Sequence, residues 1–186
     1  TYENYLDLVY VDGSDTTSHG IDVYVPGGDG PFPAIVYIHG GAWLQGDKYG
    51  PRNIIDREAT RGYVVASINY RLTPTGVRWP TPMYDVKAAV RWLRAHAARY
   101  KIDPTRIAAW GDSAGAHLAA VLGTSAGVAS LEDLSMGNAS ESSRVQAVLD
   151  WYGPTDFLQM DSQCDDDHDA SDSAESELVG CAIQTC

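Results

Sequence analysis

The 186-residue sequence has no run of 18 or more consecutive apolar residues. A helix needs about 20 such residues to cross a bilayer, so the sequence predicts no membrane-spanning helix. Residues 1–4 also lack the basic and apolar regions of a signal peptide. Because the chain begins with Thr rather than Met, we expect that an upstream segment was removed, either a signal peptide or part of a longer sequence.

Basic residues are missing from the last part of the chain. Between Asp150 and Cys186 there are ten acidic residues and no Lys or Arg, within a net charge of −12. Proteins that bind nucleic acids or anionic membrane surfaces need a basic surface. The charge pattern therefore argues against both partners and favours neutral or cationic ones.

Cysteine is scarce, with Cys164, Cys181 and Cys186 all in the last 23 residues. Three cysteines make neither a metal-binding quartet nor a full disulfide framework, and the sequence predicts no metal and no cofactor. A Cys181–Cys186 pair would suit an oxidising compartment, whereas three free thiols would suit the cytosol. We favour a secreted protein, with a cytoplasmic one as the alternative.

The apolar residues that are present follow an α/β pattern. Residues 34–38 form an almost continuous apolar run, typical of a strand covered on both faces. Between residues 84 and 98 the apolar positions recur at helical spacing instead. The alternation predicts a single α/β domain with a mostly parallel sheet and flanking helices. We expect strands at 5–11, 20–25, 34–38, 63–69, 107–110 and 145–152, the first two antiparallel, and helices at 52–61, 84–98 and 114–122.

Residues 161–177 form an acidic, polar segment that we expect to loop over the surface. A short helix is predicted near its end. Asp172 or Ser173 would cap the first turn, and Gly180 would end the helix.

Residues 111–115, Gly-Asp-Ser-Ala-Gly, have the G-x-S-x-G form between a predicted strand and a predicted helix. This context is typical of a nucleophilic serine on a tight strand-to-helix turn. The glycines are needed because side chains there would collide with neighbouring backbone. Ser113 is therefore our candidate nucleophile, and the alternative is a serine that only caps a helix.

A second motif, His-Gly-Gly-Ala-Trp, occupies residues 39–43 directly after a predicted strand. Adjacent glycines allow backbone N–H groups to face one point, as an oxyanion hole requires. We expect amides near Gly40 and Gly41, with that of Ala114, to form this hole. Trp43 is a candidate lining residue for an acyl or sugar group, with packing under the loop as the alternative.

These two motifs, with Gly46-Asp47-Lys48, residues 69–72, 85–94 and 102–104, resemble the small bacterial esterases related to hormone-sensitive lipase, and among them the acetyl and feruloyl esterase-like group. The resemblance implies an α/β-hydrolase fold with eight mostly parallel strands and hydrolysis of short-chain carboxylic esters. Ala42 and Ala116 stand where this group commonly has glycine, a departure that bears on pocket shape and chain-length preference.

A nucleophilic serine needs a histidine base and an acid to orient it, and in this fold both follow the serine. Only His117 and His168 do so. We predict that His117 packs or lies at the surface and that His168 lies in a solvated loop. The resemblance implies an acid after a seventh strand and a histidine after an eighth. We therefore expect the sequence to lack the last strands and to be inactive alone, with an open sheet edge or a second chain in their place.

The pattern thus favours a serine carboxylic ester hydrolase that forms an acyl-enzyme on Ser113, acting on small-molecule or carbohydrate esters of acetyl or feruloyl type. Two alternatives remain open from the sequence. One is a non-catalytic binding module or inactive fragment on the same fold. The other is a peptidase of the same fold.

Overall fold

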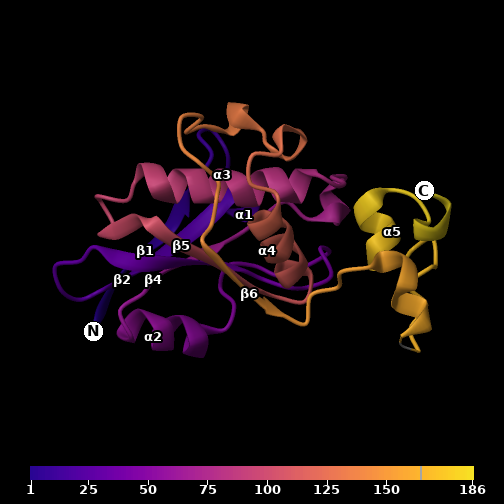
Figure 1. Ribbon diagram of the computed structural model, residues 1–186, viewed down its shortest axis with the longest axis horizontal. Coiled ribbons are helices and arrows are strands. Elements are labelled where there is room, and N and C mark those ends of the chain that lie inside the picture. The colour runs from indigo at the N-terminus through magenta and orange to yellow at the C-terminus, as the bar shows by residue number, and fades with distance from the viewer. Residues whose placement is uncertain (164) are drawn as a thin grey trace.

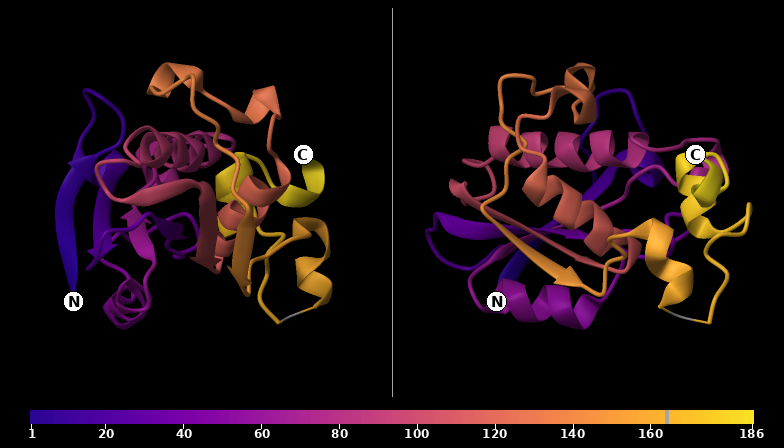
Figure 2. Two further views of the ribbon diagram at one scale, coloured as in Figure 1. Left: turned by 60° about the vertical axis from the view of Figure 1, so that its left-hand side comes forward. Right: turned by 45° about the vertical axis from the view of Figure 1, so that its right-hand side comes forward.

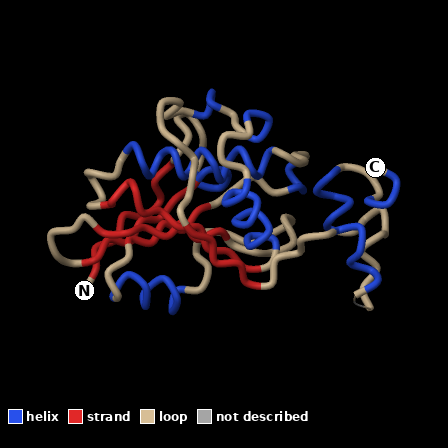
Figure 3. Tube along the Cα trace, in the orientation of Figure 1, coloured by secondary structure: helices blue, strands red, loops and turns tan. Residues whose placement is uncertain are grey.

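The computed structural model describes residues 1–163 and 165–186. Its centre is a six-stranded sheet in the order β1-β2-β4-β3-β5-β6 (Figures 1 and 3). The first two strands pair antiparallel, β2 pairs antiparallel with β4, and the remaining four strands run parallel. This confirms the antiparallel start and the mostly parallel sheet. The strands are β1 Tyr2–Val9, β2 Gly20–Pro26, β3 Phe32–Ile38, β4 Val64–Ile68, β5 Ile102–Asp112 and β6 Ala147–Trp151.

Helices cover both faces of the sheet. In Figure 1, α2 lies on one side of the sheet and α3 and α4 on the other, while α5 lies at the end of the molecule near the C-terminus. The α-helices are α1 Thr16–His19, α2 Arg52–Thr60, α3 Thr81–Ala95, α4 Ala114–Thr124 and α5 Ala174–Val179. Short 3-10 helices are η1 Thr73–Thr75, η2 Ala129–Leu131, η3 Leu134–Met136, η4 Phe157–Ser162 and η5 Ile183–Thr185.

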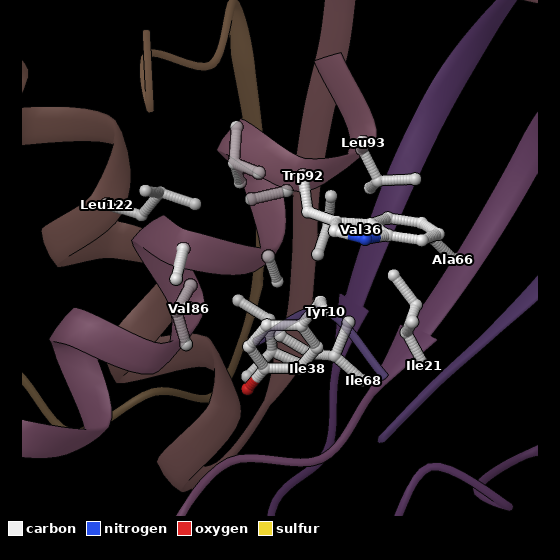
Figure 4. Close-up of a cluster of buried hydrophobic side chains, with 14 of the residues drawn as sticks. Tyr10, Ile21, Val36, Ile38, Ala66, Ile68, Val86, Trp92, Leu93 and Leu122 are labelled. Carbon is white, nitrogen blue, oxygen red and sulfur yellow. The ribbon is translucent and has the colours of Figure 1, made fainter. Parts of the chain in front are cut away.

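Alternating side chains of the buried strands divide the core into two layers. Val36 and Ile38 of β3 join the larger cluster beneath α3 and α4, which also contains Val86 and Leu122 (Figure 4). Tyr37, between them in sequence, points to the other face and packs in the smaller cluster beside α2. Covering both faces explains why these strands are continuously apolar in sequence.

Several elements differ from the sequence expectation, and for helices α3 and α1 the reason is local. Helix α3 begins at Thr81, three residues before the predicted start, because Pro82 is tolerated in a first turn, where its missing N–H has no intrahelical partner. The one-turn helix α1 was not predicted. Asp15 caps it by accepting a hydrogen bond from the Ser18 amide at 2.7 Å.

Strand β6 is the outer strand of the sheet, and all five of its residues are exposed, including Leu149 and Trp151. The expected open edge is therefore present. After β6 the chain leaves the sheet and forms a separate group of short helices that includes α5 (Figure 2).

The short C-terminal helix agrees with its sequence signals. Ser173 caps α5 by accepting the Ser176 amide, and Gly180 ends it in the left-handed conformation at φ 87°. The expectation that all of 161–177 is a surface segment is wrong at its end. Glu175 is only 4% exposed and Ser176 2%, because the first turn of α5 packs inward.

Candidate active site

Ser113 stands on a strained turn between β5 and α4. Its φ of 52° and ψ of −124° place a non-glycine residue in a rarely populated region, at a cost of about 1 to 3 kcal/mol. Its side chain makes no capping hydrogen bond to α4. The strain without a cap favours the interpretation as a nucleophile over that of a capping serine.

The glycines on either side of Ser113 are required by close backbone approach. A Cβ on Gly111 would lie 2.3 Å from the Gly115 carbonyl, and a Cβ on Gly115 would lie 2.1 Å from the Ile38 oxygen. Neither position has room for a side chain. The collision predicted from the motif is therefore present on both sides of the turn.

The turn after β3 lies against Ser113. A Cβ on Gly40 would be 3.2 Å from the Ser113 Cβ and 2.7 Å from the Asp112 oxygen, and Gly41 has a φ of 107° that favours glycine. Within the described part of the chain, no hydrogen bond occupies the amides of Gly40, Gly41 or Ala114. Two N–H groups from this turn and one from the start of α4 are thus without a partner among the described residues, as an oxyanion hole requires.

His39 holds this turn in place. Its ring stacks on Tyr70 with centroids 4.4 Å apart, and its Nδ1 donates to the Gly40 carbonyl at 2.7 Å. The Tyr70 hydroxyl donates to the His39 carbonyl at 2.9 Å. Burial lowers the pKa of His39, which favours the neutral ring that this arrangement uses. Sequence analysis did not assign His39 a role, because stacking between residues 31 positions apart leaves no local signal.

Asp112, next to the serine, is also fixed. The Tyr37 hydroxyl donates to Asp112 Oδ1 at 2.5 Å across the β3–β5 pair. Burial and this hydrogen bond raise the pKa of Tyr37 well above its ordinary value. Tyr37 therefore remains a donor and holds the turn that presents Ser113.

Ser113 opens into a cavity of about 530 Å³. One side comes from the turns after β3, β5 and β6, at the carboxyl ends of parallel strands, where ligands bind in open α/β sheets. The other side comes from the segment after β6. The lining residues are Ala42, Trp43, Ser113, Ala114, Tyr152, Gly153, Pro154, Met160, Asp166, Asp167, His168, Ser173, Ala174 and Glu175.

Trp43 combines the two roles considered for it. Its side chain lines the cavity, yet the residue is only 1% exposed. It packs edge-on against His117, with ring centroids 5.3 Å apart, and against Phe157 at 5.5 Å. It is a buried wall of the cavity with a small accessible surface.

His117 is a packing residue, as predicted. Its ring contacts Trp43, Trp79 and Phe157, and burial lowers its pKa to about 4. Its Nδ1 has no hydrogen-bond partner in the described part of the chain. A neutral ring enclosed by aromatic side chains does not supply a base to Ser113.

His168 lies in a loop, as predicted, and its side chain is 21% exposed. His168 lines the same cavity as Ser113, and its Nδ1 donates to Glu175 Oε2 at 3.1 Å. No hydrogen bond joins His168 to Ser113 in the residues described. Sequence reasoning missed this contact because the acidic composition of residues 165–169 indicates only a solvated loop. The burial of Glu175 depends on the packing of α5, which composition does not reveal.

The site shows no metal-binding arrangement: residues 1–163 and 165–186 contain no cluster of three or more His, Cys, Asp or Glu side chains suited to a metal ion. The same residues include no helix long and apolar enough to cross a membrane. Cys181 and Cys186 form a disulfide bond, which is the first of the two alternatives that the sequence left open. Cys164 lies outside the described residues.

This sheet with its strand-to-helix serine turn defines an α/β-hydrolase fold. The chain belongs to the BD-FAE family, whose model matches residues 21–186. Among known proteins it is similar to a probable carboxylic ester hydrolase, LipM, of Mycobacterium tuberculosis, with 35% identity over 132 residues, 70% of this chain and 30% of the relative.

Solved structures agree on the fold. A bifunctional GH43-CE protein of Bacteroides eggerthii superposes with a TM-score of 0.87 and 34% identity, over 96% of this chain and 26% of that one. A truncated carbohydrate esterase from gut microbiota gives a TM-score of 0.86 and 32% identity, over 97% of this chain and 66% of that one. The chain spans about a third of the length of the curated relatives it matches. The comparisons give no support to a second chain covering β6.

Proposed function

We propose that this chain contains the nucleophile and oxyanion hole of a serine carboxylic ester hydrolase. The observation that supports this most directly is the strained, uncapped Ser113 beside the free amides of Gly40, Gly41 and Ala114. Ser113 Oγ attacks the acyl carbon, the alcohol leaves with a proton, and water then releases the acid from the acyl-enzyme. The amides stabilise the negative oxygen in each step, at about 3 to 4 kcal/mol per donor.

The substrates we propose are short-chain acyl esters, of acetyl or feruloyl type, of small molecules or carbohydrates. The family name, the carbohydrate esterase neighbours and the mixed apolar and polar lining of the cavity support this choice. Ala42, which stands where the resemblance leads us to expect glycine, lines the cavity and is therefore a position that bears on chain-length preference.

Hydrolysis of p-nitrophenyl acetate by the full-length protein and by Ser113→Ala tests the proposal. We expect the substitution to lower kcat on the order of 10⁶-fold, as loss of a triad serine does. Equal rates for the two proteins would exclude Ser113 as the nucleophile.

We also propose that the protein acts in an oxidising compartment outside the cytoplasm. The Cys181–Cys186 disulfide supports this location, because cytosolic thiols are kept reduced. Peptide mapping of the protein isolated from its native source, after alkylation without reductant, checks the pair. Recovery of both cysteines as alkylated thiols would contradict the location.

A further inference from the structure

The two sides of the Ser113 cavity differ in polarity. The side nearest the serine contains Ala42, Trp43 and Pro154, whereas the facing side contains carboxylates and the His168 ring. An ester has two halves around its reacting carbon, and a short acyl group is the apolar one. The polar side therefore suits an alcohol half with hydroxyl groups, since carboxylates accept and imidazolium donates hydrogen bonds.

His168 is held rigidly on this polar side. Its Nδ1 bonds to the buried Glu175, and its backbone N–H donates to Asp161 Oδ1 at 2.6 Å. Its side chain is 21% exposed, and Nε2 has no protein partner within the described residues. The hydrogen bond with Glu175 raises the pKa of His168, which favours a ring whose Nε2–H is a donor.

The element that holds Glu175 is fixed to the body of the protein. The Leu178 carbonyl of α5 accepts the Trp79 amide at 2.7 Å, and Leu178 is only 1% exposed in the main core. Ser176 Oγ accepts the Ile183 amide at 3.1 Å, which ties α5 to the following turn. These contacts attach the element that carries Glu175 to the part of the protein that carries Ser113.

We infer that His168, oriented by Glu175, is a specificity-determining residue that binds a hydroxyl group on the alcohol half of the ester. The nearby Asp166 and Asp167 carboxylates, which line the same side, disfavour alcohols that carry negative charge. This inference rests on the proposed ester hydrolase function. It assigns selectivity for an uncharged, hydroxyl-bearing alcohol to one residue pair.

The test compares three substrates with the full-length protein: a monoacetylated methyl xyloside, the corresponding acetylated methyl glucuronide, and p-nitrophenyl acetate, whose leaving group has no free hydroxyl. We expect His168→Gln to lower kcat/KM for the xyloside by about 10- to 100-fold, mainly through KM. The rate on p-nitrophenyl acetate should stay within about twofold of wild type. Asp166→Asn with Asp167→Asn should raise the relative rate on the glucuronide.

His96→Gln is the matched control, because His96 stacks on Trp92 and bonds to its carbonyl at the end of α3, and it is absent from the cavity lining. It should leave the ratio between substrates unchanged. An equal loss on all three substrates by His168→Gln, no loss on any, or no wild-type activity on the xyloside would each overturn the inference. Failure of the proposed function is separate, because it would appear as Ser113→Ala retaining the wild-type rate.

Discussion

Ser14 and Ser113 each have a histidine and a carboxylate nearby, but only Ser113 has the surroundings of a nucleophile. Ser14 Oγ bonds to His19 Nδ1 at 2.5 Å, and His19 Nε2 bonds to Asp85 at 3.1 Å. Ser113 makes no such bond, although His168 and Glu175 line its cavity. Judged by hydrogen bonds alone, Ser14 would be the better candidate.

The surroundings of the two serines favour Ser113 as the nucleophile instead. Asp85 also binds Arg71, whose Nη2 donates to it at 2.6 Å, so the acid near Ser14 is already neutralised. Asp15 caps α1 by accepting the Ser18 amide, so this donor at the helix start is also occupied. Ser113, in contrast, has a positive φ, an uncapped helix start and free amides. A network in which every group has a partner stabilises the fold, whereas a reactive site keeps strain and unused donors.

The largest expected effect is on labelling by a fluorophosphonate probe, which reacts with activated serines. Ser113→Ala should abolish labelling of the full-length protein, because the oxyanion amides serve only that position. Ser14→Ala should be labelled like wild type. Labelling of Ser113→Ala that disappears with Ser14→Ala would overturn the comparison, and mass spectrometry of the labelled peptide identifies the residue.

Asp85→Asn tests the stabilising role of the Ser14 cluster. We expect a loss of about 3 kcal/mol in the free energy of unfolding, because Arg71 and His19 lose their shared carboxylate at a site where Asp85 is fully buried. The value is at the low end for such pairs because the Arg71 side chain is 31% exposed. Urea denaturation measures it.

Asp103→Asn is the matched control for that substitution, since Asp103 pairs with Arg106 at the surface, at 2.7 Å. Its loss should be clearly smaller than that of Asp85→Asn, because exposed ion pairs contribute little to stability. Similar losses for both variants would show that the buried Asp85 cluster contributes no more to stability than a surface ion pair does.

The buried His117 near Ser113 should make the stability of the protein depend on pH. Burial lowers the pKa of His117 to about 4 from 6.5, so the unfolded chain takes up the proton first. Stability from the neutral ring is present above pH 6.5 and is lost as pH falls toward 4, by on the order of 3 kcal/mol. Between pH 6.5 and pH 4, the free energy of unfolding of His117→Phe should fall less than that of the wild type. Urea denaturation at each pH measures it.

His96→Phe serves as the control for the His117 measurement, because His96 stacks on Trp92 at the end of α3, away from the aromatic side chains that enclose His117. Its stability should fall with pH as that of the wild type does. A wild-type pH profile unchanged by His117→Phe would contradict the expected proton uptake.

The smallest effect concerns strain near Ser113. Ala42 has a φ of 56°, so Ala42→Gly should raise the free energy of unfolding by a few tenths to about 1 kcal/mol. Ala116→Gly, inside helix α4, should lower it by about 0.5 to 1 kcal/mol. Thermal unfolding of both variants checks the opposite signs, and a shared sign would show that Ala42 is not strained.

The fold was predictable where the pattern is local. Apolar runs identified β3 and β4, helical spacing identified α3, and Ser173 with Gly180 bounded α5. Helix α1 was not predicted, because a helix of a single turn is too short to show a periodic pattern. The glycines around Ser113 were also predictable, since a turn with close backbone contacts requires them.

The sequence by itself determined the α/β class, the serine turn and the glycine turn that faces it, because each depends on residues adjacent along the chain. Only the tertiary structure decided the roles of His39, His168 and Glu175. Histidine changes its role with burial and partners, and these come from segments far apart in sequence. The acidic run that composition assigns to solvent thus becomes one side of the Ser113 cavity, because α5 anchors it there.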